Sequence, residues 1–285
     1  MIKEPLDCQQ IHRMFSPESL VNLSKIEIFD TIDSTNTWLL KQAKAGAASG
    51  HVCLAEQQTQ GRGRLGRSWY SPRGTNIYCS LLWRFSPDQD VSGLGIAVGV
   101  MVVNALSQYG IRLRLQLKWP NDVLARSRKL SGILLERNES AVVIGIGINL
   151  DVKSAEEKNW IDVAELTGRT AERNVLMGLL LNEMLTKLPL FEKNGLNLFL
   201  PEWRKYDALL GKNIVINTPR ENIPGVMRGV NENGELLLEN KAGVLQNFAS
   251  GEASVIRSHK SQMLDVSDTP NIYPHTTNAN TQLDN

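Results

Sequence analysis

The sequence predicts an α+β fold, in which a mixed, largely antiparallel sheet packs with helices and is followed by a small β-barrel. The stretches 91–109 and 174–191 carry apolar residues in the pattern of helices packed against a sheet. Three candidate strands between residues 115 and 149 are joined by short turns, which favour antiparallel pairing. After Gly211 the pattern changes to short strands broken by Asn and Gly turns, as in a small barrel.

The first half alternates strands with polar segments. Ser, Thr and Asn side chains at 33–36 are suited to capping a helix that ends near Gly46. The polar stretch 56–74 is rich in Gly and Arg and is expected to be a loop. The expected elements, in order, are a strand at 26–29, this helix, a strand at 51–55, the loop, an aromatic and β-branched strand at 76–85, and the apolar helix at 91–109.

The second half is expected to finish the sheet, cover it and form the barrel. The expected elements are strands at 115–119, 129–136 and 141–149 with turns at 120–122 and 137–139, helices at 174–191 and 196–209, and barrel strands at 214–216, 225–230, 235–238, 244–248 and 253–256. The predicted organisation is an N-terminal linker at 1–25, a large domain at 26–209, a barrel domain at 210–257 and a disordered tail at 258–285.

Bulk composition excludes several classes of function. Lys and Arg total 31 against 30 for Asp and Glu, so no chain-wide charge attracts nucleic acid or an anionic membrane. Three cysteines without a C-x-x-C pair, no signal peptide and no membrane-spanning stretch favour the cytoplasm. Four histidines leave few members for a triad or a His metal site, so no protein metal ligand is expected.

The segment from Gln58 to Trp69 carries the strongest chemical signal. Its glycines allow close approach of a ligand, and Arg62 and Arg64 present permanent charges that match carboxylate and phosphate oxygens. A solvated basic turn is the plain alternative. The segment also satisfies G-x-G-x-x-G from Gly61 to Gly66, but it leads into a strand rather than a helix, so a dinucleotide-binding turn is not expected.

A second cluster combines Lys118, Asn121 and Asp122 with Lys129 and Gly132. Strand, turn and strand would bring the two lysines toward one edge of the sheet, where the glycine leaves room for a ligand. Turn chemistry alone also explains these residue types. Because positioned cations are present without an enzyme nucleophile motif, acyl adenylation followed by attack of an external amine is favoured.

These segments resemble the biotin protein ligases over roughly residues 26–256. The resemblance rests on GRGRLGRSW at 61–69, KWPNDVL at 118–124, KLSGILLE at 129–136, DSTN at 33–36 and GIGIN at 145–149. It implies a catalytic domain related in architecture to class II aminoacyl-tRNA synthetases, followed by an SH3-like β-barrel. It also implies formation of biotinyl-5'-AMP from biotin and ATP with Mg²⁺, and transfer of biotin to a lysine of the biotin carboxyl carrier protein of acetyl-CoA carboxylase.

The resemblance also implies roles for individual residues. Arg64 and Lys129 would face the biotin carboxylate and the α-phosphate, and Trp69 would stack on adenine. Asp122 would either orient the carrier lysine or act near the metal. The implied catalytic residues are Arg64, Lys129 and Asp122, and the implied binding residues are Ser34, Thr35, Asn36, Gln58, Arg62, Gly63, Arg64, Trp69, Lys118, Asn121, Lys129, Gly132 and Asn149.

Some alternatives stay open at this stage. Family members that act as repressors carry an N-terminal winged helix of roughly 60 residues, and only about 25 residues precede the first strand here, so repression is not expected. A lipoate-type ligase or transferase shares the architecture, and a nucleic-acid-binding protein could use the Arg-rich loop. A homodimer is allowed, whereas nucleic acid and membranes are not expected as partners.

Overall fold

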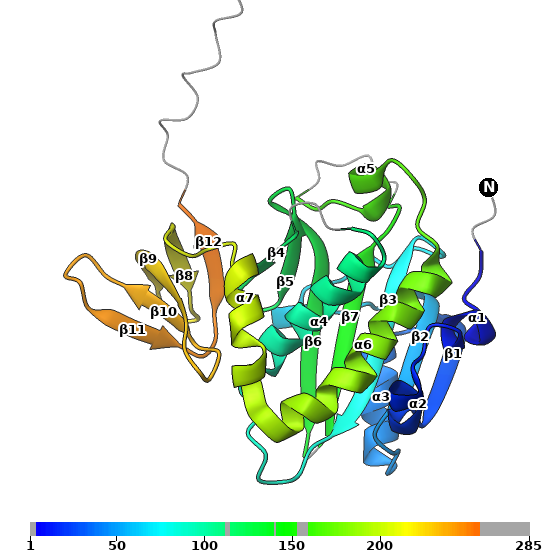
Figure 1. The fold of residues 1–285 in the computed structure, drawn as a ribbon. Coiled ribbons are helices and arrows are strands. Elements are labelled where there is room, and N and C mark those ends of the chain that lie inside the picture. The colour runs from blue at the N-terminus through cyan, green and yellow to red at the C-terminus, as the bar shows by residue number, and fades with distance from the viewer. Residues whose placement is uncertain (1–3, 112–114, 140, 153–158, 257–285) are drawn as a thin grey trace, which may run out of the picture. The chain divides into compact units, whose positions relative to one another are not determined.

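A seven-stranded mixed sheet organises the larger part of the chain (Figure 1). The structure is a computed structural model and describes residues 4–111, 115–139, 141–152 and 159–256. The strands lie in the spatial order β1-β2-β3-β7-β6-β5-β4. Their bounds are β1 (Lys25–Ile32), β2 (His51–Gln58), β3 (Asn76–Arg84), β4 (Leu115–Lys118), β5 (Asp122–Ala125), β6 (Arg128–Asn138) and β7 (Ala141–Asn149).

The strand connections determine the direction of each pair. A helix, α3 (Thr35–Lys44), connects β1 to β2, and these two strands pair parallel. The other neighbouring strands of the sheet pair antiparallel. Short turns join β4 to β5 and β5 to β6. Since a tight turn can only return the chain antiparallel, these strands pair antiparallel. The sheet is therefore mixed and largely antiparallel, as predicted.

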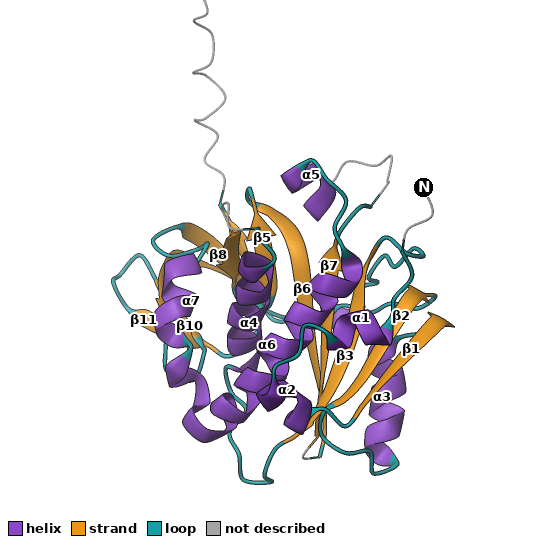
Figure 2. Cartoon of the chain, turned by 45° about the vertical axis from the view of Figure 1, so that its right-hand side comes forward, coloured by secondary structure: helices purple, strands orange, loops and turns teal. Residues whose placement is uncertain are grey.

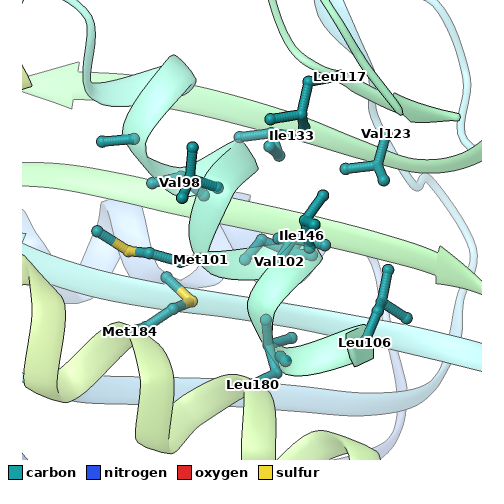
Figure 3. Packing of buried hydrophobic residues seen from close by; sticks show 14 of the residues in the cluster. Val98, Met101, Val102, Leu106, Leu117, Val123, Ile133, Ile146, Leu180 and Met184 are labelled. Atoms are coloured by element: carbon teal, nitrogen blue, oxygen red, sulfur yellow. The ribbon is translucent and has the colours of Figure 1, made fainter. Parts of the chain in front are cut away.

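The main core lies between the sheet and two helices, α4 (Leu94–Gln108) and α6 (Arg173–Asn194) (Figure 3). Successive side chains of a strand point to opposite faces, so Leu81 of β3 joins this core and Leu82 joins a smaller core beneath α3. Helix α4 is buried on nearly every side because the sheet lies on one side of it and α6 on the other (Figure 2). The labelled core residues in Figure 3 are Val98, Met101, Val102, Leu106, Leu117, Val123, Ile133, Ile146, Leu180 and Met184.

A five-stranded antiparallel sheet forms the C-terminal part, in the order β11-β10-β9-β8-β12. Its strands are β8 (Asn213–Asn217), β9 (Asn222–Val230), β10 (Leu236–Glu239), β11 (Leu245–Phe248) and β12 (Glu252–Val255). Ile214, Met227 and Leu238 are buried inside it. The indole Nε1 of buried Trp119 donates a hydrogen bond of 3.0 Å to the carbonyl of Gly234, which ties this sheet to the end of β4.

The structure confirms the α+β class and differs from the sequence analysis in several short elements. Strand β5 was not expected: its first residue, Asp122, belongs to an expected turn, and residues 123–125 belong to no expected element, because four residues are too few for a periodic signal. The expected helix at 196–209 is a 3₁₀ turn followed by α7 (Leu200–Tyr206). Three short helices were not expected: α1 (Cys8–His12), α2 (Pro17–Asn22) and α5 (Val163–Thr167). The expected tail at 258–285 lies outside the described residues.

Candidate active site

Glycines form the floor of the site on β6 and β7. A Cβ atom on Gly147 would lie 2.4 Å from the indole of Trp69, and one on Gly132 would lie 3.0 Å from the same ring. A Cβ atom on Gly145 would lie 2.2 Å from Oδ1 of Asn36. The indole and the amide therefore lie directly against the sheet, which only residues without a side chain permit at these positions.

The start of α3 forms one wall and carries a buried network of polar groups. Ser34, Thr35 and Asn36 are each no more than 4% exposed. The backbone N–H and the hydroxyl of Thr35 donate to Oε1 of Gln58, at 2.9 and 3.1 Å. The hydroxyl of Ser80, which has one proton, donates to Oδ1 of Asn36 at 2.5 Å, and its oxygen lies 2.7 Å from Oγ1 of Thr35. Because each group has a partner, the wall is fixed before any ligand arrives.

The Arg-rich loop Gly61–Trp69 begins with an ion pair to strand β6. Nη2 of Arg62 donates to both carboxylate oxygens of Glu136 on β6, at 2.8 and 2.6 Å. Nδ2 of Asn36 donates to the same carboxylate at 2.9 Å. Glu136 thus joins the loop to the start of α3.

The remaining arginines of the loop contact two further elements. Nη1 of Arg64 donates to Oδ1 of Asn121 at 3.2 Å, in the turn between β4 and β5. Arg67 forms an ion pair with Glu252, the first residue of β12. Burial lowers the pKa of Arg64, but a guanidinium remains charged at any cellular pH. The loop is therefore held by ionic or polar contacts to both sheets.

Lys129 and Asp122 form an ion pair beside the indole. Nζ of Lys129 lies 2.7 Å from Oδ1 of Asp122 and 5.4 Å from the centroid of the Trp69 ring. Their side chains are 34% and 20% exposed. Asp122 is the first residue of β5, and Lys129 lies opposite Leu124 of the same strand, so the long lysine side chain reaches along β5 to Asp122. The ammonium thus lies at the cavity wall with its charge partly balanced.

A cavity of about 330 Å³ lies between the floor, the start of α3 and the loop. Thirteen of the fourteen residues named from the sequence line it: Ser34, Thr35, Asn36, Gln58, Arg62, Gly63, Arg64, Trp69, Asn121, Asp122, Lys129, Gly132 and Asn149. Lys118, the last residue of β4, is not among the lining residues. The structure therefore brings together segments that are far apart in the sequence.

Sequence reasoning missed other lining residues: Arg67, Ser68, Tyr70, Asn76, Tyr78, Cys79, Ile133, Leu134, Gly145, Ile146, Gly147, Val152, Trp160 and Glu252. The spacing of GIGIN could have identified Gly145 and Gly147, because a glycine at every second position leaves one face of a strand bare. No local pattern could have identified Glu252, which lies 185 residues from its partner Arg67. Burial raises the pKa of Tyr78 to about 12, so this side chain lines the cavity as a neutral phenol.

Among the residues that the structure describes, no group of three or more His, Cys, Asp or Glu side chains could hold a metal ion. None of the helices in the described ranges is long and apolar enough to cross a membrane.

Family models match two parts of the chain. Residues 28–152 match the Biotin/lipoate A/B protein ligase family. Residues 209–255 match the Biotin protein ligase C terminal domain.

Curated relatives align with most of the chain. The bifunctional ligase/repressor BirA of Salmonella typhimurium is 35% identical over 260 residues, which cover 88% of this chain and 78% of the relative. A biotin–[acetyl-CoA-carboxylase] ligase of Mycobacterium tuberculosis is 30% identical over 222 residues, covering 75% of this chain and 83% of the relative. Among solved structures, a biotin protein ligase of Aquifex aeolicus in complex with biotin and ATP matches with a TM-score of 0.74 and 28% identity, covering 83% of this chain and 100% of that one.

Proposed function

Because the chain belongs to the biotin/lipoate A/B protein ligase family, we propose that it is an ATP-dependent biotin protein ligase that makes biotinyl-5'-AMP and passes biotin to a lysine of a carrier protein. The identity and coverage of the relatives establish the family and its ligase activity. The reaction steps, the acceptor and the residue roles are our proposal. A lipoate-type enzyme has less support, since the ligases reported above are named for biotin.

One observation carries the proposal: Arg64 and Lys129 line the same cavity and are held by adjacent residues, Asn121 and Asp122, beside a floor without side chains. Two cations beside a bare surface suit a flat ligand that carries a carboxylate or a phosphate. The adjoining wall at the start of α3 offers buried polar groups of fixed position. Such a cavity suits an apolar acid with a polar ring at its far end.

In the first half-reaction, a carboxylate oxygen of biotin attacks the α-phosphorus of ATP and pyrophosphate leaves with the electrons of the broken P–O bond. Arg64 and Lys129 would stabilise the negative charge that gathers on the transferred group. Ser34, Thr35 and Gln58 would hydrogen-bond the ureido ring of biotin. The indole of Trp69, which lies against the floor, would stack on adenine.

The ion pair with Lys129 suggests the main role of Asp122. A carboxylate at 2.7 Å holds the ammonium in place and partly balances its charge. Phosphate oxygens would then compete with Asp122 for Lys129 as the nucleotide enters. We therefore assign Asp122 as a positioning residue for Lys129.

Mg²⁺ would enter with the nucleotide. Magnesium commonly binds through substrate phosphates, water and one or two carboxylates, so it needs no cluster of protein ligands. Asp122 is a carboxylate of the cavity that fits this limited requirement. The ion would supply charge neutralisation for the phosphates.

In the second half-reaction, the acceptor amine attacks the acyl carbon of biotinyl-AMP. A C–N bond forms, the C–O bond to the phosphate breaks, and AMP leaves with the electron pair. The proposed acceptor is the biotin carboxyl carrier protein of acetyl-CoA carboxylase, which the names of two relatives support.

We also infer a cytoplasmic location, supported by the free cysteines Cys8, Cys53 and Cys79. Homodimer formation stays a prediction.

The test separates the two half-reactions. Pyrophosphate release from ATP is measured with biotin, with lipoate and without an acid, and biotin transfer to a carrier domain is then followed by mass. We expect release with biotin alone, and a single biotin added to the carrier. Release that depends on lipoate, or none with either acid, would contradict the proposal.

A further inference from the structure

A second cavity of about 290 Å³ lies between the two sheets. Its walls come from the start of α4, the turn before β5, strand β6 and the loops on either side of β10 and β11. The lining includes Gly95, Trp119, Pro120, Leu135 and Glu235. No role is assigned to this cavity in the proposed function.

The two cavities share one wall. Arg64, Asn121 and Ile133 line both of them. Arg64 is also the residue proposed to face the reacting carboxyl group. The second cavity therefore reaches the first at the end where the acyl phosphate would form, away from the buried polar start of α3.

The second cavity combines an apolar passage with a carboxylate. Ile96, Trp119 and Ile133 are each 2% exposed, and Leu135 and Pro120 extend the apolar wall. Glu235 lies among these residues at the edge of the C-terminal sheet. Apolar walls suit the methylene stem of a lysine, and a carboxylate suits its ammonium group.

Glu235 is held in place with part of its carboxylate still available. Nδ2 of Asn231 donates to its Oε2 at 2.7 Å, and Nδ2 of Asn247 donates to the same atom at 3.3 Å. Within the described ranges, no hydrogen bond to its Oε1 is found. One oxygen is thus fixed by amides, and the other can accept from an incoming group.

From this geometry, and resting on the proposed function, we infer that the second cavity admits the lysine side chain of the acceptor protein and that Glu235 receives its ammonium group. The ammonium group then leaves Glu235 and advances along the apolar wall of Trp119 and Leu135 to the shared wall. There the positive charge of Arg64 favours loss of a proton from the amine to water, because like charges lower an amine pKa. The neutral amine attacks the acyl carbon, and AMP leaves.

A polyanion such as pyrophosphate fits this cavity less well. The start of α4 lines this cavity, and the dipole at the N-terminus of a helix favours an anion. In the described part of the chain, however, Arg64 is the one cation of the lining, and Glu235 opposes it. A multiply charged anion would meet almost no net positive charge.

The test compares Glu235→Gln with Glu232→Gln in the full chain. Glu232 lies three residues away in the same loop, is exposed, and is not among the lining residues, so it is a matched control for charge. Biotin-dependent pyrophosphate release, with hydroxylamine to trap the adenylate, reports the first half-reaction. Steady-state transfer to a carrier domain gives KM and kcat for the acceptor. Inhibition by added pyrophosphate is measured in parallel.

We expect Glu235→Gln to raise the acceptor KM about tenfold, since it removes one charge-assisted hydrogen bond, with adenylate trapping unchanged. Glu232→Gln should leave both values at wild type. An unchanged acceptor KM in Glu235→Gln, or a change in pyrophosphate inhibition instead, would overturn the inference. Absence of biotin adenylate in the wild-type enzyme would overturn the proposed function, and this inference with it.

Gly95→Ala tests the shape of the cavity without altering its charge. A Cβ atom there would lie 3.6 Å from both Leu135 and Pro120, which is ordinary contact, and alanine favours a helix more than glycine does. The fold should therefore be retained while the passage narrows. A higher acceptor KM with normal adenylate trapping supports the inference, and a normal KM contradicts it.

Discussion

The start of α3 and the loop Gly61–Trp69 line the same cavity but are held by different forces. At α3, Thr35 and Asn36 are almost fully buried, and their partners Gln58 and Ser80 are neutral, while Nδ2 of Asn36 also donates to the carboxylate of Glu136. In the loop, Arg62 and Arg67 have side chains that are 43% and 65% exposed and pair with distant carboxylates. Exposed ion pairs typically contribute about 0–1 kcal/mol each, whereas breaking a buried hydrogen bond costs about 1–3 kcal/mol.

This contrast suggests a division of labour. The buried wall at α3 can recognise the neutral part of a ligand with little rearrangement, because its groups are already in place. The loop can exchange carboxylate partners for ligand oxygens, since each contact is weak and partly hydrated. Removing a cation of the site should therefore lower the reaction rate, and disturbing the buried network should lower the free energy of unfolding.

The largest expected effect comes from removing a cation. Lys129→Met should lower the rate of biotinyl-AMP formation by about 10²–10³-fold, because a charge near the transition state is lost. The folded state should change little, as judged by circular dichroism. Lys44→Met is the control, since Lys44 is exposed in the last turn of α3 and is not among the lining residues, and it should retain nearly full activity. Equal loss in both variants would mean that Lys129 has no special role.

The next effect concerns the buried wall. Gly145→Ala should lower the free energy of unfolding by about 1–3 kcal/mol, because the new methyl group would overlap Oδ1 of Asn36. Gly63→Ala in the loop is the matched substitution. Its Cβ would have no neighbour closer than 3.6 Å, so little change in stability is expected. Urea titration of both variants measures the free energy of unfolding. A similar decrease in the two variants would show that the wall at α3 is no more tightly packed than the loop.

A smaller effect is expected where the loop meets the C-terminal sheet. Arg67→Gln should reduce stability by at most about 1 kcal/mol, and high salt should shrink that loss because the pair is exposed. A double-mutant cycle with Glu252→Gln isolates the pair from other contacts of either residue. A coupling free energy that is large and insensitive to salt would show that the loop is held as firmly as α3.

The smallest effect lies at Asp30 on the edge strand β1. Its hydrogen bond to Arg73 lowers the pKa of Asp30 below the usual value. A carboxyl whose folded pKa is lowered stabilises the protein above its unfolded pKa, and the contribution disappears as pH falls through the folded pKa. Asp30→Asn should therefore be slightly less stable than wild type near neutral pH and equal to it in acid. A difference that persists in strong acid would rule out the ion pair as its cause.

Sequence reasoning succeeded where a pattern is local. The capping residues before α3, the aromatic and β-branched run of β3 and the apolar run of α4 are each visible in residues that lie close together in the sequence. It missed β5 because four residues beside a turn show no period. It missed Glu136 and Glu252 because a carboxylate at a strand position gives no sign of its distant arginine.

The central claim is that the loop closes over an adenylate held between cations. Hydrogen–deuterium exchange read by mass spectrometry on peptides covering Gly61–Trp69 tests it most directly, with no ligand, with biotin alone, and with biotin and ATP together. The account predicts slower exchange in these peptides when both substrates are present, while peptides around the start of α3 change much less. Unaltered exchange in Gly61–Trp69 under conditions where pyrophosphate is released would contradict it.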